Sequence, residues 1–457
     1  FLLRRQAEEN LRFIANHDAL TGLPNRLMFR DRLEEALLRA RREEITLHVL
    51  FIDLDQFKDV NDSLGHNAGD QLLRAVADRL RQQVVQPGMI ARLGGDEFIV
   101  LVEEPLDEDP GVQRTVDAIQ GALCAAFVVS GRQLQVTASI GISSFPGDGD
   151  DAQTLLKHAD IAMYGAKQRG KNTFQLYVRE MSTSLQRRID MESHLRHAVD
   201  NGEFVLHYQP RICLRTNRCT GVEALIRWDH PTLGRVMPMD FIPLAEETGA
   251  IVPIGAWVLR EACRQNAEWL ARGQGPIRVS VNLSARQFAD PHLHDDIVEA
   301  LARAQLPGDL LELELTESMV MRHPEQAAGW LANLKRTGVR LSIDDFGTGY
   351  SSLAYLNHFP IDVIKIDRSF IRDVPDSLSD TQIASAVIAL GHSLGLEVVA
   401  EGAETQAHID FLRNEGCDEV QGYFYSRPIP AGDMTSFLSH RLDCGLAEKQ
   451  GPQTVRA

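Results

Sequence analysis

The chain has few cysteines, an excess of acidic over basic residues and no long apolar run, and each of these shortages argues against a class of protein. Its six cysteines form no CxxC pair, which favours reduced thiols in a cytoplasmic protein over disulfides or a metal-binding motif. The formal net charge of -17 argues against general nucleic-acid binding, so we expect no DNA or RNA partner. Because no stretch of about 18 apolar residues occurs, no membrane span is expected within the chain.

The length and the first residues predict a multidomain piece of a longer protein. At 457 residues, two or three domains are expected. The chain begins with Phe1 and has no signal peptide, so we expect an upstream sensor region and possible attachment to a membrane on its cytoplasmic side. Apolar positions among charges predict that residues 1–16 form a helix entering from upstream. This helix is either a solvated linker or the end of a coiled-coil stalk.

Two segments with different patterns of predicted helices and strands follow that helix. Residues 17–178 predict an α+β domain, with strands over 47–55 and 134–145, a hairpin over 89–102, and helices over 33–42, 69–84 and 150–169. A charged helix over 179–199 joins it to residues 200–440, where strands and helices alternate as in a β/α barrel. Residues 441–457 are polar and predict a flexible tail.

Seven apolar stretches in the second half end on a carboxylate, an amide or a lysine. Strands with polar groups at their C-terminal tips bring distant residues together at the mouth of a β/α barrel. So many acids in one cavity repel each other unless cations lie among them, which points to a metal-dependent enzyme. The polar residues of these stretches are Glu223, Asn282, Glu314, Glu317, Asp344, Asp345, Lys365, Asp367, Glu401 and Gln421.

The first half contains a second candidate site. Asp53 ends an apolar strand, and Asp96 follows a glycine pair at a hairpin tip, where the backbone can approach a ligand closely. The two carboxylates are suited to share a magnesium ion with substrate phosphates. Lys167 and Lys171, spaced i and i+4 in a predicted helix, would share one face and hold a triphosphate. The alternative is an ordinary hairpin turn with surface acids.

Four ordered motifs in this half resemble the GGDEF diguanylate cyclase family: DALTGLPNR (18–26), DLDQFKDVNDSLGHNAGD (53–70), RLGGDEF (92–98) and ADIAMYGAKQRGKN (159–172). The resemblance implies a nucleotide-cyclase-like fold in which a homodimer condenses two GTP molecules, with Mg²⁺, to cyclic di-GMP. It also implies roles by position. Asp53, the Leu54 carbonyl and Asp96 bind metal; Glu97 activates the 3′-hydroxyl or assists the metal; Asn61 and Asp70 recognise guanine; and Lys58, Lys167 and Lys171 contact phosphates.

One departure from this family is visible. Many members carry an RxxD pair before the glycines that binds product and inhibits the enzyme, whereas this chain has Val85-Gln86-Pro87-Gly88 there. The product cannot be bound at that position without the planar guanidinium of the missing arginine, so we expect no feedback inhibition there.

The second half resembles the EAL family of cyclic di-GMP phosphodiesterases. The resemblance rests on Glu223-Ala224-Leu225, on DDFGTGYSS (344–352) and on the strand tips described above, and it implies a modified TIM-like barrel. Glu223, Asn282, Glu314 and Asp344 are hard oxygen ligands suited to Mg²⁺ or Mn²⁺, and Asp345, Asp367 and Glu401 can hold a second ion.

The remaining residues of the predicted barrel site would serve the substrate and the water. Lys365 would position the water and neutralise charge, because the surrounding acids oppose the depressed pKa that a lysine base needs. Gln421 would orient the water or Lys365. Gln209 and Arg227 would contact substrate. The loop 345–352 is expected to be mobile over the metals. Glu317 would anchor that loop, which in the family couples dimer contacts to metal affinity.

Three hypotheses remain open from the sequence. The chain is a bifunctional enzyme that both makes and hydrolyses cyclic di-GMP, or a phosphodiesterase whose first domain only binds GTP and regulates the barrel. The third hypothesis is a receptor that binds cyclic di-GMP without turnover. The receptor hypothesis requires losses in the ligand set, and no expected barrel ligand is missing.

Overall fold

The computed structural model describes residues 13, 15–43, 45–83, 88–105, 111–348, 353–356 and 358–443. The chain divides into two compact units, Phe1–Ile189 and Asp190–Ala457. Their boundary falls inside helix α7 (Arg179–Leu195), in the region where the sequence predicts a joining helix. Most of the predicted first helix (1–16) and of the tail (441–457), the positions Val85–Pro87 and the residues 349–352 of the predicted mobile loop lie outside the described residues.

The first unit is built on a sheet of strand order β2-β3-β1-β6-β7. Its central strand β1 (Ile45–Leu54) pairs antiparallel with β3 (Glu97–Pro105) and β6 (Ala138–Phe145). The edges are β2 (Met89–Gly94), antiparallel to β3, and β7 (Phe174–Leu176), parallel to β6. The predicted hairpin is confirmed as β2 and β3. The predicted strand over 134–145 is divided, because a separate hairpin of β4 (Phe127–Val129) and β5 (Arg132–Leu134) ends before β6 begins.

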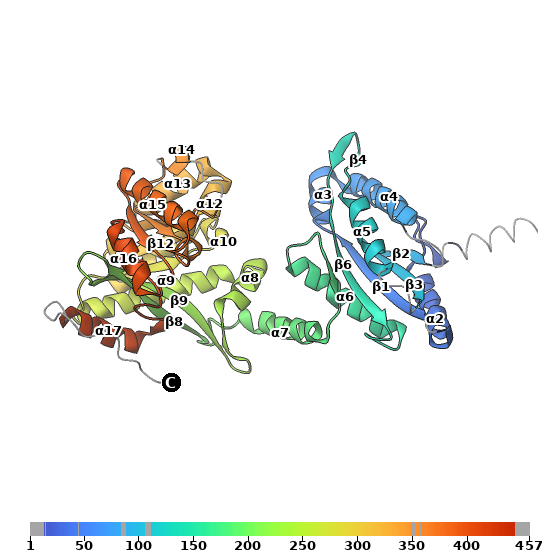
Figure 1. The fold of residues 1–457 in the computed structure, drawn as a ribbon, viewed down its shortest axis with the longest axis horizontal. Coiled ribbons are helices and arrows are strands. Elements are labelled where there is room, and N and C mark those ends of the chain that lie inside the picture. Colours follow the sequence, from blue (N-terminus) through green and yellow to red (C-terminus); the bar gives the residue numbers. More distant parts are fainter. Residues whose placement is uncertain are drawn as a thin grey trace, which may run out of the picture. The chain divides into compact units, whose positions relative to one another are not determined.

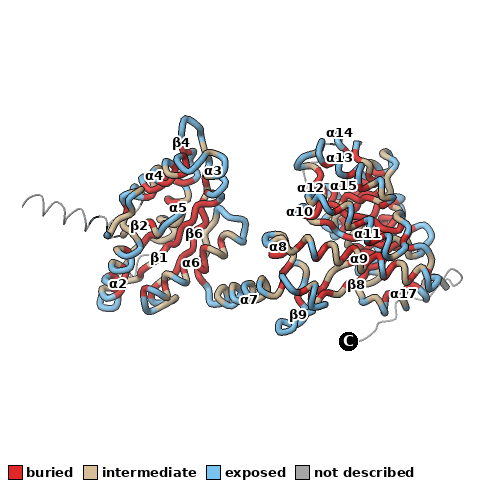
Figure 2. Tube along the Cα trace, turned by 180° about the vertical axis from the view of Figure 1, so that it is seen from behind, coloured by how far each residue is buried: buried red, intermediate tan, exposed pale blue. Residues whose placement is uncertain are grey.

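Helices cover both faces of this sheet. Alternate residues of β1 belong to two separate apolar clusters, with Leu50 and Ile52 in one and Val49 and Phe51 in the other. Helices α4 (His66–Gln83) and α5 (Gly111–Cys124) contribute to the first cluster, which also includes Phe57 of α3 (Phe57–Leu64). Helices α2 (Arg26–Glu43) and α6 (Ala152–Gln168) contribute to the second. The strands accordingly appear as buried segments in Figure 2.

The second unit contains a closed barrel, with helices arranged around its strands in Figure 1. The strands follow the order β9-β11-β12-β13-β14-β15-β16-β8, and the pairing of β8 with β9 closes the ring. Strand β8 runs antiparallel to both neighbours, whereas the pairs from β9 to β16 are parallel. The strands are β8 (Phe204–Cys213), β9 (Cys219–His230), β11 (Arg278–Asn282), β12 (Leu311–Thr316), β13 (Arg340–Phe346), β14 (Val363–Ile366), β15 (Glu397–Ala400) and β16 (Glu419–Gln421).

The larger elements around the barrel are α8 (Pro238–Thr248), α9 (Ile251–Ala271), α11 (Leu293–Ala304), α12 (Glu317–Arg322), α13 (Pro324–Lys335), α15 (Leu378–Ser393), α16 (Gln406–Asn414) and α17 (Ala431–Asp443). The shorter elements are β10 (Gly234–Val236), β17 (Ile429–Pro430), α10 (Ala285–Phe288), α14 (Leu353–Leu356), η1 (Gly308–Leu310) and η2 (Arg368–Phe370). None of the helices in the described ranges is long and apolar enough to cross a bilayer.

The alternation along β12 explains how acids enter the barrel. Leu311, Leu313 and Leu315 belong to the apolar core of this unit, so Glu312 and Glu314 face the opposite way. One sequence expectation needs correction: Glu223 does not end its strand but lies within β9. The strand continues because its outer part pairs with both β8 and β10, which the sequence pattern does not reveal.

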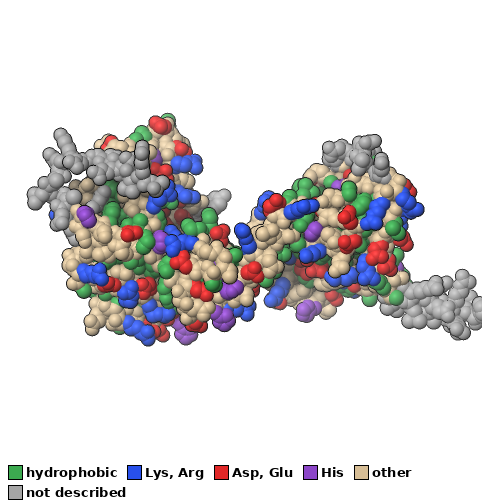
Figure 3. All heavy atoms as spheres, turned by 90° about the horizontal axis from the view of Figure 1, so that it is seen from below, with side chains coloured by type: hydrophobic (Ala, Val, Ile, Leu, Met, Phe, Trp, Pro, Cys, Tyr) green, Lys and Arg blue, Asp and Glu red, His purple; other side chains and the backbone are tan. Residues whose placement is uncertain are grey.

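The surface carries charges of both signs. In the face shown in Figure 3, Lys and Arg side chains are interspersed with Asp and Glu on each unit, so many charges are compensated locally. Among the described cysteines, Cys124, Cys213, Cys219, Cys263 and Cys417 have free thiols.

Candidate active sites

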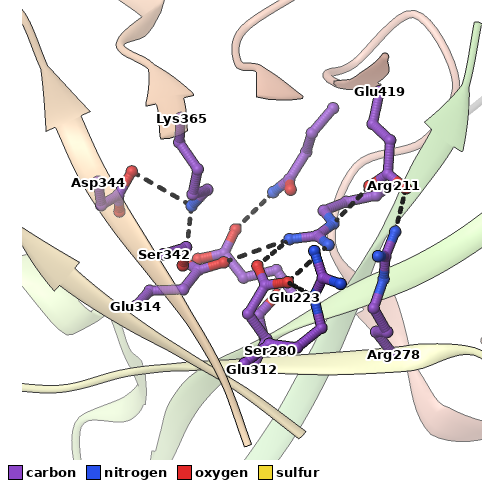
Figure 4. Close-up of polar contacts among 12 residues, drawn as sticks. Arg211, Glu223, Arg278, Ser280, Glu312, Glu314, Ser342, Asp344, Lys365 and Glu419 are labelled. Carbon is purple, nitrogen blue, oxygen red and sulfur yellow. Dashed lines mark hydrogen bonds and ion pairs between the residues drawn. The ribbon is translucent and has the colours of Figure 1, made fainter. Parts of the chain in front are cut away.

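At the mouth of the barrel, three carboxylates surround one buried lysine. The Lys365 Nζ atom lies 2.6 Å from Glu314 Oε2, 3.2 Å from Asp344 Oδ1 and 2.5 Å from Glu401 Oε1. These residues come from β14, β12, β13 and the end of β15, and Figure 4 shows Lys365 between Asp344 and Glu314. The Lys365 side chain has no exposed surface, so its charge depends entirely on these acids.

Glu223 lies beside this cluster and is held by two amides. Its Oε1 accepts a hydrogen bond of 2.6 Å from Asn282 Nδ2, and its Oε2 accepts one of 2.5 Å from Gln421 Nε2. Gln421 Nε2 also donates to Gln209 Oε1 at 3.0 Å. Because β8 and β9 pair antiparallel with Gln209 opposite Glu223, the strand register itself brings these side chains together.

The carboxylates at the mouth outnumber Lys365, and burial together with these charges shifts several pKa values. Burial raises the pKa of Glu314 well above its usual value, although Lys365 opposes that rise. Burial likewise raises the pKa of Glu401 to about 8, again against the effect of Lys365. For Glu223 burial acts in the same direction, but Lys365 and the two amides outweigh it and its pKa is lowered. Burial would lower the pKa of Lys365, but Asp344 and the other acids raise it well above its usual value, so the side chain is an ammonium.

The donor set fits a divalent cation. Glu314 Oε1 and Gln421 Oε1 are buried without a hydrogen-bond partner, so each has a lone pair to offer. The oxygens are hard ligands of the kind that Mg²⁺ and Mn²⁺ prefer. Within the described residues no group of three or more acid, histidine or cysteine side chains stands in a ready metal-binding arrangement. Lys365 Nζ lies where the carboxylates of Glu314, Asp344 and Glu401 converge.

A cavity of about 250 Å³ opens onto these residues. Glu223, Glu401 and Gln421 lie in its wall together with the two predicted substrate contacts, Gln209 and Arg227. Arg227 is largely buried, its Nη1 donates to the Ile226 carbonyl at 2.8 Å, and the residue lines the cavity.

The two aspartates predicted for a second ion lie beside each other. Burial raises the pKa of Asp345, with further contributions from Asp344 and Asp367. The Asp345 N–H donates to Asp344 Oδ1 at 3.0 Å, and Asp345 has a left-handed φ of 54°. Asp367 caps η2 by accepting from the Ser369 N–H. Asp345 is the second-last residue of β13 and Asp367 directly follows β14, so both lie at the same end of the barrel as Lys365.

The start of the predicted mobile loop is tied to α12. The Gly347 N–H donates to Glu317 Oε2 at 3.0 Å, and Glu317 is buried. The contact joins the residues that the sequence predicts as anchor and loop.

In the first unit, the candidate site forms at the end of β1. Lys167 Nζ lies 2.7 Å from Asp53 Oδ1, and Asp53 pairs with Glu97 across the β1–β3 ladder. The Leu54 N–H donates to the Asp96 carbonyl at 3.4 Å. Gly95 has a φ of 54°, so the turn before Asp96 favours glycine. Burial raises the pKa of Asp53, with Lys167 opposing and Asp96 adding to the rise.

Lys171 does not share a helix face with Lys167, so this expectation was wrong. Helix α6 ends at Gln168, and Gly170 has a φ of 107°. Lys171 and Asn172 follow in left-handed conformations, and the Asn172 N–H donates to Asp55 Oδ2 at 3.0 Å. The turn, fixed by this hydrogen bond, replaces the helix that the spacing predicts.

The predicted guanine contacts lie on neighbouring helices. Asn61 is in α3, and Gly69 and Asp70 are in α4. A Cβ atom on Gly69 would lie 2.0 Å from Asn61 Oδ1, so the Asn61 amide packs directly against the residue before Asp70. Lys58 is exposed on α3, and no contact in the described residues joins it to the other predicted residues.

We expect the Gly69→Ala variant to bind GTP about tenfold more weakly, the equivalent of one lost hydrogen bond of about 1.4 kcal/mol. The added methyl group must displace the Asn61 amide. Gly121→Ala on α5 is the control, because its Cβ would meet nothing within 4 Å. Isothermal titration with a non-hydrolysable GTP analogue measures the effect, and equal affinity in both variants would contradict the assignment of Asn61.

Sequence reasoning missed polar residues that support both sites. Asp55 accepts hydrogen bonds from Thr137 Oγ1 and Ser139 Oγ, and Arg92 joins Asp18 to the Gly95 carbonyl. The available signals were a charged residue inside the apolar strand β2 for Arg92 and an acid directly after the apolar strand β1 for Asp55. In the barrel the missed residue is Arg211, which is fully buried among glutamates.

These features define a chain of two units, an α+β unit with an acid–lysine site and a closed β/α barrel with a candidate divalent-metal centre. The EAL domain family model matches residues 192–428, and the model described as "Diguanylate cyclase, GGDEF domain" matches residues 15–173. The chain belongs to the EAL family and carries a GGDEF domain before its EAL domain. The predicted fold class and the predicted family are confirmed.

Known relatives share both domains. MucR of Pseudomonas aeruginosa, named a bifunctional diguanylate cyclase/cyclic di-GMP phosphodiesterase, is 45% identical over 436 residues, which are 95% of this chain and 63% of that protein. NbdA of the same organism, named a cyclic di-GMP phosphodiesterase, is 42% identical over 440 residues, with 96% and 56% covered. This chain therefore spans about half to two thirds of the length of these relatives.

A solved structure described as "PaMucR Phosphodiesterase, c-di-GMP complex" matches the barrel. It is 47% identical to this chain with a TM-score of 0.52, and the match covers 54% of this chain and 99% of that one.

Proposed function

We propose that the barrel hydrolyses cyclic di-GMP to linear pGpG. The observation that carries this proposal is the convergence of Glu314, Asp344 and Glu401 on Lys365, with Glu223 and Glu401 in the wall of the adjoining cavity. The names of MucR and NbdA, and the cyclic di-GMP complex of the MucR barrel, support the choice of substrate. In the reaction a water oxygen bonds to phosphorus, the bond from phosphorus to the 3′-oxygen breaks, and that oxygen leaves as a hydroxyl.

Each residue of the proposed barrel site has its own role in this reaction. Glu223, Asn282, Glu314 and Asp344 would hold one Mg²⁺ or Mn²⁺ ion, and Asp345, Asp367 and Glu401 a second. When bound, such ions supply Lewis-acid activation of water and neutralise phosphate charge. Lys365 stays an ammonium, positions the water and stabilises charge on the phosphate. Gln421 orients Lys365 or the water, Gln209 and Arg227 contact the substrate, and Glu317 holds the start of the loop.

For the first unit we propose diguanylate cyclase activity in a homodimer, with Mg²⁺ and GTP bound at Asp53, Leu54 and Asp96. The approach of Lys167 to Asp53 supports a phosphate and metal site at this point. The alternative is that this unit binds GTP and regulates the barrel without making product. A receptor without turnover is the third candidate, and the full set of acids at the barrel mouth disfavours it. An upstream sensor region would set the balance between the activities.

Nucleotide chromatography after incubation with Mg²⁺ tests these proposals. We expect cyclic di-GMP to be converted to pGpG. Acceleration by GTP would support the regulated phosphodiesterase, and cyclic di-GMP formed from GTP alone would support the bifunctional enzyme. Binding of cyclic di-GMP without any turnover would overturn the phosphodiesterase proposal in favour of the receptor.

A further inference from the structure

A second charged cluster lies inside the barrel beneath the mouth. The Arg211 side chain, from β8, has no exposed surface. Its Nη1 and Nη2 atoms contact Glu312 Oε1 and Oε2 at 2.5 and 3.2 Å, and its Nε lies 3.2 Å from Glu419 Oε2. Figure 4 shows the guanidinium between these glutamates and Glu314. A guanidinium held by both oxygens of one carboxylate has a fixed plane and direction.

The same guanidinium faces Glu314, a predicted metal ligand. Arg211 Nη1 lies 3.8 Å from Glu314 Oε1, the oxygen that has no hydrogen-bond partner, while Glu314 Oε2 receives Lys365. Glu312 and Glu314 are two residues apart on β12 and therefore point to the same side of the strand. Two cations therefore contact the Glu314 carboxylate, with Lys365 at Oε2 and the Arg211 guanidinium on the side of Oε1.

Salt bridges at the opposite end of the barrel hold this arginine in place. Arg278 and Arg340 begin β11 and β13, and both lie 2.9 Å from Glu397 Oε2. Arg278 also contacts Glu419, and Arg340 Nε lies 3.7 Å from Glu312 Oε2. Both carboxylates that bind Arg211 therefore have a second arginine.

We propose that Arg211 is a positioning residue that fixes the Glu314 carboxylate for the divalent ions of the barrel. The inference rests on the proposed function, because it assumes that Glu314 is a metal ligand. Partners behind a metal ligand orient it and typically change metal affinity by about 10- to 100-fold when they are lost. Arg211 has this relation to Glu314, whereas Arg264 holds the two oxygens of Glu261 on the exposed face of α9.

The test compares Arg211→Lys with Arg264→Lys in the full chain, because Arg264 makes a comparable two-bond contact with Glu261 on the exposed face of α9. Both variants keep the positive charge and remove the pair of hydrogen bonds that a guanidinium makes to one carboxylate. Only Arg211→Lys also alters the contact with Glu314. Mn²⁺ binding is measured by electron paramagnetic resonance, and the barrel signal is the part that the Glu223→Ala variant loses. We expect Arg211→Lys to weaken this binding about tenfold or more, with wild-type affinity in Arg264→Lys. Thermal melting is recorded for each variant.

The other outcomes are distinct. Wild-type Mn²⁺ affinity in Arg211→Lys, or an equal loss in both variants, overturns the positioning role. If Arg211→Lys does not fold, Glu312→Gln decides, because this isosteric change frees the guanidinium that Glu312 holds. Weaker Mn²⁺ binding in Glu312→Gln supports the proposal, and unchanged binding overturns it. If wild-type protein shows no Glu223-dependent Mn²⁺ binding, the metal centre of the proposed function fails and the inference falls with it.

Discussion

Replacing Glu223 by alanine is expected to abolish hydrolysis of cyclic di-GMP while leaving the fold intact. The substitution removes a proposed metal ligand and leaves the amides of Asn282 and Gln421 without their shared acceptor. Loss of a partner behind a ligand costs about 10- to 100-fold in affinity or activity, so loss of the ligand itself should cost more than about 100-fold. Formation of pGpG in the presence of Mg²⁺, followed by chromatography, measures the loss.

Glu325→Ala provides the matched control. Glu325 is an exposed glutamate in the first turn of α13, away from the strands that carry the site, so its removal should leave turnover at the wild-type rate. Circular dichroism and thermal melting establish that both variants are folded. A folded Glu223→Ala protein that turns over cyclic di-GMP as fast as Glu325→Ala would refute the assignment of the metal site.

The sequence predicts which acids come together around Lys365 because strand periodicity and strand ends are local properties. An apolar run that ends in Lys365 and Asp367, or in Glu401, needs only to become a parallel strand for its polar end to reach the mouth. Once the strands close into a ring, their C-terminal ends lie side by side, and no further feature of the single segments is needed. The predicted convergence on one mouth follows from this rule, and the contacts of Lys365 with three carboxylates realise it.

The contacts that depend on tertiary structure could not be predicted in this way. Arg211 alternates with other polar residues along β8, and only the closed barrel shows that three glutamates surround it. The i, i+4 spacing of Lys167 and Lys171 predicts a shared helix face, but a left-handed turn fixed by Asp55 intervenes. Glu223 is followed by further strand because two partners extend β9 beyond the mouth. In the first two cases a residue distant in sequence decides the local outcome, and in the third the pairing with two neighbouring strands decides it.

The second large effect concerns Asp96 in the first unit. In a Glu223→Ala background, where product is not consumed, we expect GTP to be converted to cyclic di-GMP and Asp96→Ala to reduce this synthesis to background. Asp96 follows the Gly94-Gly95 turn, its carbonyl accepts from Leu54, and its carboxylate raises the pKa of Asp53, so the two acids are close enough to repel each other. Removing one carboxylate leaves too few ligands to hold Mg²⁺ against the GTP phosphates.

The matched control is Asp31→Ala, an exposed aspartate on α2 that should leave synthesis unchanged. Synthesis from GTP that continues in Asp96→Ala would refute the assignment of this site. If the Glu223→Ala background makes no cyclic di-GMP although it binds GTP, the first unit is not a working cyclase. GTP bound to the first unit would then serve only to regulate the barrel. Faster formation of pGpG by the wild-type chain in the presence of GTP would be the expected sign of this regulation. The two results therefore separate the bifunctional enzyme from the regulated phosphodiesterase without any change to the barrel assignment.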